Sequence, residues 1–377
     1  MDESASLLCL PGGEAYADPQ RYPVIPFNRK ALAEFAATYY QEPSKSLKLI
    51  GVTGTNGKSS VVYYLRQLLE AMGEKVLSVG TLTHPLTTPE SWDLQAIFAD
   101  HLKKGGTYAV MEVSSIGIDQ GRVLQMDFDI KCFTNISQDH LDYHKSFDAY
   151  KKAKWDFMQH YPGKALWPED FENITLTYEA PCRFQATNLK AALAVLNTLG
   201  FEASQLNKIL PNLKHPPGRF EYVNCGQSFD VVVDYAHTPD GLAVVLEEAK
   251  QISREKGGQL WTVFGCGGDR DKGKRPLMAA VAEKWADQVI LSSDNPRSED
   301  PQKIIEDMVK GLKCPEKAVL EADRKAAIAY ALKNIGSQDL LLIAGKGHEK
   351  VQVISGQRIP FDDVQVAADL LKEIYGL

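Results

Sequence analysis

The sequence lacks several features that would assign it to a special class of protein. Its six cysteines form no C-x-x-C pair, which argues against zinc sites and a disulfide framework and indicates a reducing compartment. No apolar run approaches the ~20 residues that span a bilayer. Residues 1–4 have neither the basic start nor the apolar core of a signal peptide. We therefore expect a cytoplasmic protein with no membrane partner.

Basic charge is also not in excess. The chain has 42 Lys and Arg residues against 49 Asp and Glu residues, a net charge of −7, which argues against a protein that binds nucleic acid over a broad surface. Hydrophobic residues make up 44% and charged residues 24% of the sequence, a globular composition. At ~150 residues per domain, the 377 residues predict two or three domains.

Strand-like and helical segments alternate from residue 48 onwards, which is typical of a mainly parallel sheet with helices on both faces. The segment 161–184 has no clear periodicity and is expected to be irregular. The strands expected in this first series are 47–52, 75–79, 108–113 and 130–135, and the helices are 58–72, 94–103, 147–160 and 188–199.

A cluster of prolines and a glycine at 210–218 indicates a linker. After it, strands are expected at 229–234, 260–265, 288–292 and 340–344, and helices at 242–256, 275–285, 301–312 and 324–335. We therefore predict an α/β protein in three parts. These are a short N-terminal segment (1–45) with one helix at 29–40, a central P-loop domain (46–217) with a mainly parallel sheet, and a Rossmann-like α/β domain (218–377).

The glycine-rich loop GVTGTNGKS, residues 51–59, lies between the first strand and the first helix of the central domain. Glycines let backbone N–H groups approach phosphate oxygens, and the helix N-terminus adds its positive dipole end. Lys58 can reach the outer phosphates, and the Ser59 hydroxyl can ligate Mg²⁺. Val52 replaces the glycine of the strict P-loop pattern, but the GKS end is intact. The loop therefore predicts nucleotide binding.

This loop resembles the ATP loop of the Mur ligase and folylpolyglutamate synthetase superfamily, and more motifs follow in that family's order. They are EVSS at 112–115, CFTNISQDHLDYH at 132–144, AKW at 153–155, DYAHTPD at 234–240, FGCGGDRDKGKR at 264–275, DNPR at 294–297 and GKGHE at 345–349. The ordered set is similar to the diaminopimelate-adding, MurE-type branch. The resemblance implies a ligase of peptidoglycan synthesis that adds meso-diaminopimelate, or a close analogue, to a carboxylate donor. ATP would drive the reaction through an acyl phosphate.

Forming an acyl phosphate brings two anions together, so cations must hold them. The resemblance implies that Lys154 is carbamylated by CO₂, which requires an amine whose pKa is lowered by burial or by nearby cations. The implied catalytic residues are Lys58, Glu112, His140 and Lys154. The implied Mg²⁺ ligands are Ser59, Glu112, His140 and Lys154. The implied ATP contacts are Gly54, Thr55, Asn56, Gly57, Lys58, Ser59, Ser60 and His237.

The resemblance also implies two substrate-contacting sets. In the acceptor set, the Arg297 guanidinium could pair with the distal carboxylate of diaminopimelate, and Glu349 with its distal ammonium. The implied donor contacts are Thr87, Thr88, Ser114, Gln120 and Arg122. The implied acceptor contacts are Arg270, Asp294, Asn295, Pro296, Arg297, Gly345 and Glu349.

Three departures from the family pattern lie on the donor side. Residues 1–45 are too few for the family's UDP-binding domain of about a hundred residues. Leu86 replaces an asparagine, and Ile116 and Gly121 replace histidines. The donor is therefore expected to be a small-molecule or peptide carboxylate that need not be UDP-linked. The alternatives are a folylpolyglutamate-type glutamate ligase and a non-catalytic, nucleotide-binding Mur homologue. We expect a monomer or a weak homo-oligomer.

Overall fold

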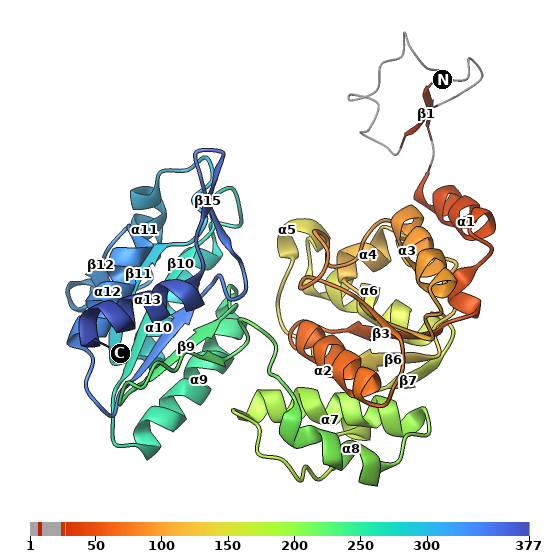
Figure 1. Ribbon diagram of the computed structural model, residues 1–377. Helices are drawn as coiled ribbons and strands as arrows, with labels where there is room; N and C mark the ends of the chain where they lie inside the picture. The colour runs from red at the N-terminus through yellow and green to blue at the C-terminus, as the bar shows by residue number, and fades with distance from the viewer. Residues whose placement is uncertain (1–6, 10–23, 27, 377) are drawn as a thin grey trace. The chain divides into compact units, whose positions relative to one another are not determined.

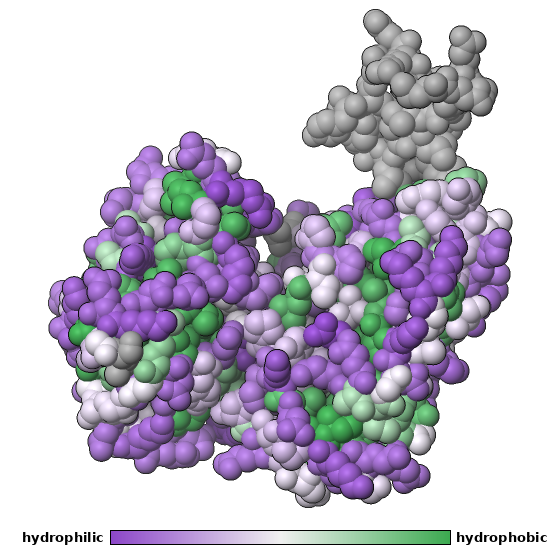
Figure 2. All heavy atoms as spheres, viewed as in Figure 1, coloured by the Kyte–Doolittle hydropathy of each residue, from purple (hydrophilic) through white to green (hydrophobic). Residues whose placement is uncertain are grey.

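The computed structural model describes residues 7–9, 24–26 and 28–376, and the chain divides into two compact units. The N-terminal unit comprises Met1–Glu179 and Phe184–Leu213, and the C-terminal unit comprises Ala180–Arg183 and Lys214–Leu377. No helix in the described part of the chain is long and apolar enough to cross a membrane. The face shown in Figure 2 is largely hydrophilic on both units, with scattered hydrophobic residues.

The N-terminal unit is built on a five-stranded, all-parallel sheet with the strand order β4-β5-β3-β6-β7. In chain order its strands are β3 (Lys48–Thr53), β4 (Val76–Val79), β5 (Tyr108–Glu112), β6 (Ile130–Phe133) and β7 (Lys164–Leu166). Its helices are α1 (Arg29–Tyr39), α2 (Lys58–Ala71), α3 (Ser91–Lys103), α4 (Ser115–Asp119), α5 (Leu141–His144), α6 (Phe147–His160), α7 (Arg183–Thr198) and α8 (Ala203–Ile209). The short strands β1 (Leu7–Cys9) and β2 (Val24–Pro26) pair with each other.

Alternate residues of β3 face opposite sides of this sheet, so the sheet has a core on each face. Ile50 and Val52 pack in one cluster with the apolar residues of α2 and α7. Leu49 packs in the other cluster with residues of α3 and α6. Helices thus cover both faces of the sheet (Figure 1).

The C-terminal unit has a six-stranded sheet with the strand order β12-β11-β10-β13-β9-β8, in which β8 alone is antiparallel to its neighbour. Its strands are β8 (Glu221–Tyr222), β9 (Asp230–Asp234), β10 (Leu260–Cys266), β11 (Gln288–Ser293), β12 (Val319–Leu320) and β13 (Leu340–Ala344). The hairpin of β14 (Val351–Ile354) and β15 (Gln357–Pro360) stands apart from the sheet. The helices are α9 (Pro239–Glu255), α10 (Lys274–Trp285), α11 (Pro301–Val309), α12 (Arg324–Asn334) and α13 (Asp363–Tyr375).

The alternating α/β pattern predicted from the sequence is confirmed in both units. The prediction that the segment 161–184 is irregular is wrong in part, since the segment contains the edge strand β7. A strand of three residues is too short to show periodicity, and its neighbour β6 supplies the hydrogen bonds that define it. The sequence pattern also missed α8, the hairpin β14–β15 and α13.

A buried ion pair joins α12 to α13 in the C-terminal unit. The Arg324 and Asp363 side chains are both fully buried, and Nε and Nη2 of the arginine each donate to a carboxylate oxygen at 2.8 Å. The same guanidinium donates to the backbone carbonyls of Ser293 at 3.2 Å and Ala344 at 2.8 Å. Arg324 therefore also holds the carboxyl ends of β11 and β13 in place.

We predict that Arg324→Met lowers the free energy of unfolding by about 3–5 kcal/mol, because it leaves the Asp363 carboxylate buried without its partner. Urea denaturation followed by circular dichroism would measure this change. Arg358→Met on the exposed strand β15 is the matched control, and we expect it to change the free energy by less than about 0.5 kcal/mol. Equal effects of the two substitutions would contradict the role given to the buried pair.

Candidate active site

The phosphate loop lies at the carboxyl end of β3, next to the carboxyl end of β5. In the parallel register Val52 pairs with Glu112, so the two strands end side by side. The loop needs glycine at two positions, since Gly54 and Gly57 have φ values of 145° and 87°. A Cβ atom on Gly54 would also lie 1.9 Å from Oγ1 of Thr134. The strand–loop–helix setting predicted for this motif is confirmed.

A buried carboxylate lies beside the first turn of α2. Glu112 is 2% exposed, and its Oε2 accepts a hydrogen bond from Oγ of Ser59 at 3.0 Å. Its Oε1 accepts from the backbone N–H and the hydroxyl of Thr81, at 2.9 and 3.0 Å. Oxygen ligands of this kind suit Mg²⁺, which commonly binds one or two carboxylates, phosphates and waters. Ser59 and Glu112 therefore fit the Mg²⁺ role predicted for them. Thr81 is not among the residues predicted from the sequence.

Two lysine amines converge on one carbonyl group of the loop. Nζ of Lys58 lies 2.9 Å from the oxygen of Gly54, and Nζ of Lys154, from α6, lies 2.8 Å from the same atom. Lys154 is 1% exposed. Burial, together with the Lys58 charge, lowers the pKa of Lys154 well below its usual value, against an opposing effect of Asp139. One turn earlier on α6, the Tyr150 hydroxyl lies 2.8 Å from the Thr55 hydroxyl.

His140 is near this cluster but is not grouped with the Glu112 carboxylate. Its ring lies 6.2 Å from the Tyr150 ring, and its Nε2 lies 3.5 Å from an Asp139 oxygen. Within residues 28–376 no group of three or more His, Cys, Asp or Glu side chains is placed to hold a metal ion. The proposed metal role of His140 therefore stays a prediction.

Four of the five predicted donor contacts form one hydrogen-bonded group. The Thr88 hydroxyl donates to the Glu112 carbonyl at 3.0 Å and contacts the Ser114 hydroxyl at 3.1 Å. Arg122 donates to Gln120 Oε1 through Nε and Nη2, at 3.0 and 2.7 Å, and to the Thr88 carbonyl at 2.8 Å. The group is thus connected through the backbone to the Glu112 strand end, and Thr87 directly precedes Thr88.

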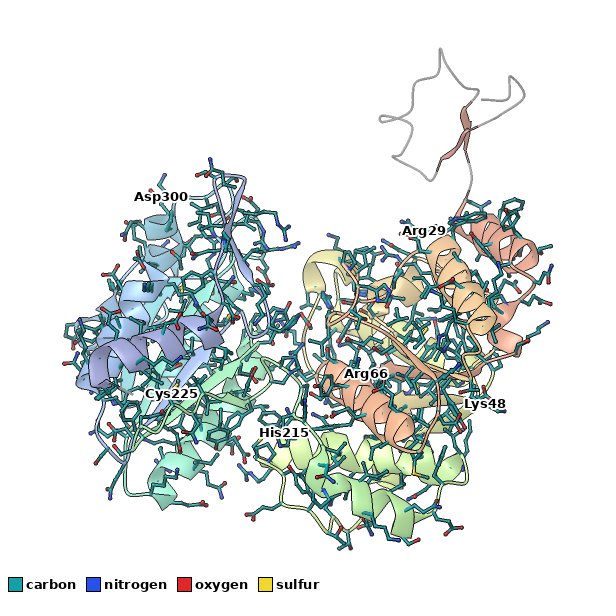
Figure 3. All side chains as sticks on the ribbon, in the orientation of Figure 1. Arg29, Lys48, Arg66, His215, Cys225 and Asp300 are labelled. Carbon is teal, nitrogen blue, oxygen red and sulfur yellow. The ribbon has the colours of Figure 1, made fainter. Side chains whose placement is uncertain are left out.

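A glutamate that the sequence reasoning did not single out pairs with this arginine. Oε1 of Glu90 lies 3.1 Å from Arg122 and 3.2 Å from Arg29. Arg29 stands at the start of α1, beside the helix α3 that Glu90 precedes (Figure 3). The donor group is therefore linked to α1 by a chain of alternating charges.

The predicted acceptor residues of the C-terminal unit lie at the ends of β10, β11 and β13. A Cβ atom on Gly267 would lie 2.8 Å from Nη1 of Arg297, 3.6 Å from Arg270 and 3.8 Å from Asp294. Arg297 has a φ of 52° and donates to the carbonyl of Gly268 at 2.7 Å. Arg270 is exposed on the loop that follows β10. The space beside Gly267 is therefore bordered by the Arg297 guanidinium, the aliphatic part of the Arg270 side chain and the Asp294 carboxylate.

The remaining acceptor residues surround a buried amide. The Nδ2 atom of Asn295 donates to Oε2 of Glu349 at 2.8 Å. Asn295 follows Asp294 and precedes Pro296, and Gly345 lies at the end of β13 with a φ of 111°. Asp294 is 9% exposed, and its Oδ1 atom has no hydrogen-bond partner among the described residues. The structure thus brings the predicted acceptor residues together within one unit.

His237 follows β9 in the C-terminal unit. Its Nδ1 lies 3.1 Å from the Tyr235 carbonyl, and the two rings lie 4.7 Å apart. Its own carbonyl accepts a hydrogen bond from Lys274 at 2.8 Å. Because the phosphate loop belongs to the other unit, the contact of His237 with ATP stays a prediction.

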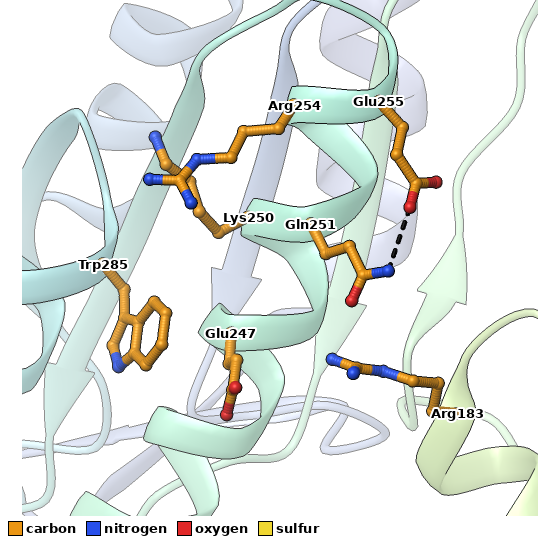
Figure 4. A pocket seen from close by; sticks show the side chains of 7 residues that line it. All are labelled: Arg183, Glu247, Lys250, Gln251, Arg254, Glu255 and Trp285. Carbon is orange, nitrogen blue, oxygen red and sulfur yellow. Dashed lines mark hydrogen bonds between the residues drawn. The ribbon is translucent and has the colours of Figure 1, made fainter.

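An open hollow of about 370 Å³ lies elsewhere on the C-terminal unit (Figure 4). It is lined by the second half of α9 and the end of α10. These parts of the two helices lie away from the carboxyl ends of the strands. Its lining combines both signs of charge, so it favours neither an anion nor a cation. The lining residues are Arg183, Glu247, Lys250, Gln251, Arg254, Glu255 and Trp285.

Each of the two units is matched for the most part by one family model. The model of the Mur ligase middle domain matches residues 52–187, and that of the Mur ligase glutamate ligase domain matches residues 218–347. The chain belongs to the Mur ligase family.

Similar curated proteins include those of Syntrophomonas wolfei and Caldanaerobacter subterraneus. They are 37% and 39% identical over 92% of this chain, which covers 83% and 82% of their own lengths. Both are named UDP-N-acetylmuramoyl-L-alanyl-D-glutamate–2,6-diaminopimelate ligase. A solved structure of that name is similar over 99% of this chain and 93% of its own, with 31% identity and a TM-score of 0.62.

A folylpolyglutamate synthase of Mycobacterium tuberculosis, solved with ADP and AMPPCP, has a TM-score of 0.64 at 16% identity. The match covers 92% of this chain and 95% of that one. At this identity the likeness concerns the fold alone.

We predict that Gly80→Ala weakens the binding of Mg²⁺-ATP. The added methyl group would lie 2.2 Å from Oε1 of Glu112, so the carboxylate must leave the position in which it accepts a hydrogen bond from Ser59. Isothermal titration calorimetry should show at least about a tenfold loss of affinity, as for one lost charge-assisted interaction. Binding of ADP without Mg²⁺ is the internal control and should change less. Unchanged Mg²⁺-ATP affinity would show that the Glu112 position does not matter for the nucleotide.

Proposed function

We propose that the protein is an ATP-dependent amide ligase that joins meso-diaminopimelate, or a close analogue, to a carboxylate donor. The observation that carries this proposal is the joint presence of two polar clusters at the carboxyl ends of parallel sheets. One is suited to a transferring phosphoryl group and the other to an amino acid with extra charges. The relatives named as diaminopimelate ligases support the choice of acceptor.

The proposed reaction has two steps. A donor carboxylate oxygen attacks the γ-phosphorus of ATP, and the bond to the leaving ADP breaks. The acceptor amine then attacks the carbon of the acyl phosphate, phosphate leaves and the nitrogen loses a proton. Lys58 would neutralise charge that develops on the phosphoryl oxygens, which is the main way such transfers are accelerated. Bound Mg²⁺, held by Ser59 and Glu112, would supply further neutralisation.

The donor carboxylate would be held by the group around Arg122, whose side chain is 13% exposed. The curated relatives are named for a UDP-linked donor that ends in D-glutamate. We infer that the donor has a terminal carboxylate. The phosphate-release assay should therefore include both UDP-linked and UDP-free peptides as donors. Substrates of either kind would present the same group to Arg122, Gln120 and Thr88.

Lys154 is proposed to carry a carbamate in the active enzyme. Two amines that share the Gly54 carbonyl repel each other if both are protonated, and the more buried amine is the one that releases its proton. A neutral amine nitrogen can attack the carbon of CO₂ and lose a proton, which leaves an anionic carbamate. The anion would then attract the Lys58 ammonium instead of repelling it.

We predict that Lys154→Ala lowers ligation by about 10²–10³-fold, as expected for one lost electrostatic contribution to the transition state. In wild-type enzyme depleted of CO₂, added bicarbonate should restore activity. At a fixed CO₂ level the restored activity should fall as the pH is lowered, since a protonated amine cannot attack CO₂. Lys152→Ala, an exposed position on the same helix, is the control. An unmodified Lys154 in a fully active preparation, seen by mass spectrometry or ¹³C NMR, would disprove the carbamate.

The acceptor assignment is tested by competition among meso-diaminopimelate, L-lysine and L-glutamate, with phosphate release as the readout. The Arg297 guanidinium can make two charge-assisted hydrogen bonds to a distal carboxylate, so Arg297→Ala should lower diaminopimelate use by at least about tenfold. Wild type should discriminate strongly against lysine, which lacks that carboxylate. Arg358→Ala on the exposed hairpin strand is the matched control.

Two outcomes would overturn this assignment. If wild type uses lysine or glutamate as readily as diaminopimelate, the acceptor is wrong, and preferred use of glutamate would favour the folylpolyglutamate-type alternative. If Arg297→Ala lowers the use of all three acceptors equally, the arginine only supports the loop. Absence of phosphate release with every donor and acceptor would favour a non-catalytic homologue.

A further inference from the structure

Lys346 is a fully buried lysine in the turn that follows β13. Glycines on both sides give this turn its shape, with φ values of 111° at Gly345 and 51° at Gly347. A buried ammonium is costly unless hydrogen bonds and opposite charges compensate for its lost hydration. The ammonium of Lys346 therefore has to be satisfied by groups inside the C-terminal unit.

Those groups are mainly the proposed acceptor residues. Nζ of Lys346 lies 3.2 Å from Oδ1 of Asn295, 3.3 Å from Oε2 of Glu349 and 3.6 Å from Oδ1 of Asp294. It also donates to the carbonyl of Val351 in β14 at 2.8 Å. One ammonium thus bridges the end of β11, the turn after β13 and the hairpin.

The bridge determines which atoms remain for a ligand. Oε2 of Glu349 accepts from both Asn295 and Lys346, whereas Oε1 accepts no hydrogen bond from any described residue. The Glu349 side chain is 32% exposed, so Oε1 can meet an incoming ammonium. The lysine charge also offsets the repulsion between the Asp294 and Glu349 carboxylates, both of which lie within 4 Å of its ammonium.

The bridge also reaches Arg297 through the hairpin. Lys346 holds β14 by the Val351 carbonyl, and β14 accepts a hydrogen bond from the Arg297 N–H at the Val353 carbonyl, 2.8 Å away. The N–H of Val353 in turn donates to Oδ1 of Asn295 at 2.9 Å. The groups proposed to bind the distal carboxylate and the distal ammonium are therefore fixed relative to each other by one buried cation.

We propose that Lys346 is a positioning residue for the acceptor amino acid, an inference that rests on the proposed function. It would touch no substrate atom. It would act directly on Glu349 and Asn295, and on Arg297 through the hairpin. In this way it would set the distance between the Glu349 carboxylate, which binds the distal ammonium of the acceptor, and the Arg297 guanidinium, which binds the distal carboxylate. This role makes the acceptor affinity, and not the ATP affinity, depend on Lys346.

The test compares Lys346→Met and Lys346→Gln with wild type in steady-state phosphate release, with meso-diaminopimelate and ATP varied in turn. Each substitution should raise the KM for diaminopimelate by about tenfold or more, the effect of losing a hydrogen bond to a charged group. The KM for ATP should stay within about twofold, since the two clusters lie in separate units. Lys350→Met removes an exposed lysine four residues further along, which pairs with Asp362, and should change neither constant.

A double-mutant cycle separates positioning from general support of the fold. If Lys346 acts through Glu349, the variant with both Lys346→Gln and Glu349→Gln should bind diaminopimelate nearly as well as the weaker of the two single variants. Additive losses would overturn the proposal. If Lys346→Met does not accumulate as folded protein, Lys346→Gln carries the same test, because it removes the positive charge while keeping a polar side chain in the buried position.

The outcomes also distinguish this inference from the proposed function. A wild-type enzyme that shows no diaminopimelate-dependent phosphate release with any donor would contradict the proposed function itself. The role of Lys346 alone would be overturned by a different result, in which the wild-type enzyme uses diaminopimelate but Lys346→Gln leaves the KM for diaminopimelate unchanged. It would also be overturned if Lys346→Gln raised the KM for ATP as much as the KM for diaminopimelate.

Discussion

The parallel pairing of β3 with β5 is the constraint on which the candidate phosphate site depends. Because Val52 is in register with Glu112, the phosphate loop and the buried carboxylate leave the sheet at the same level, and the Ser59 hydroxyl can reach the carboxylate. A register shift of one residue would turn Glu112 to the other face of the sheet. The C-terminal unit uses the same principle, since its proposed acceptor residues follow the carboxyl ends of adjacent parallel strands.

Three buried basic side chains differ in the groups that compensate for the lost hydration of their charge. Arg324 is neutralised by a carboxylate and two carbonyls, and it serves the fold. Lys346 meets two carboxylates and an amide, which ties the fold to the acceptor cluster. Lys154 meets a single carbonyl, the face of the Tyr150 ring and a neighbouring cation, and no carboxylate of a described residue is within hydrogen-bond distance. Its poor compensation distinguishes it from the other two and supports a chemical role rather than a structural one.

Most long helices and strands could be predicted from the sequence, whereas the shortest ones could not. The helix predicted at 147–160 has those bounds in the structure, because its apolar face and its Ser146 cap are both local signals. Strands β7, β8 and β12 have two or three residues each, too few for a pattern, and exist because a neighbouring strand supplies their hydrogen bonds. Thr81, Glu90 and Lys346 were missed for a related reason, since their significance lies in contacts with residues distant in the sequence.

The sequence by itself determined the α/β class, the phosphate loop and the family, since these depend on local periodicity, on glycine conformations and on ordered motifs. Only the tertiary structure decided which charges are buried together. It placed Lys154 beside Lys58 under the Gly54 carbonyl and Lys346 between Asn295 and Glu349. The physical reason is that residues distant in the sequence pack around a charged side chain and determine how far it is hydrated. The hydration in turn determines the pKa of the charged group and the partners it needs.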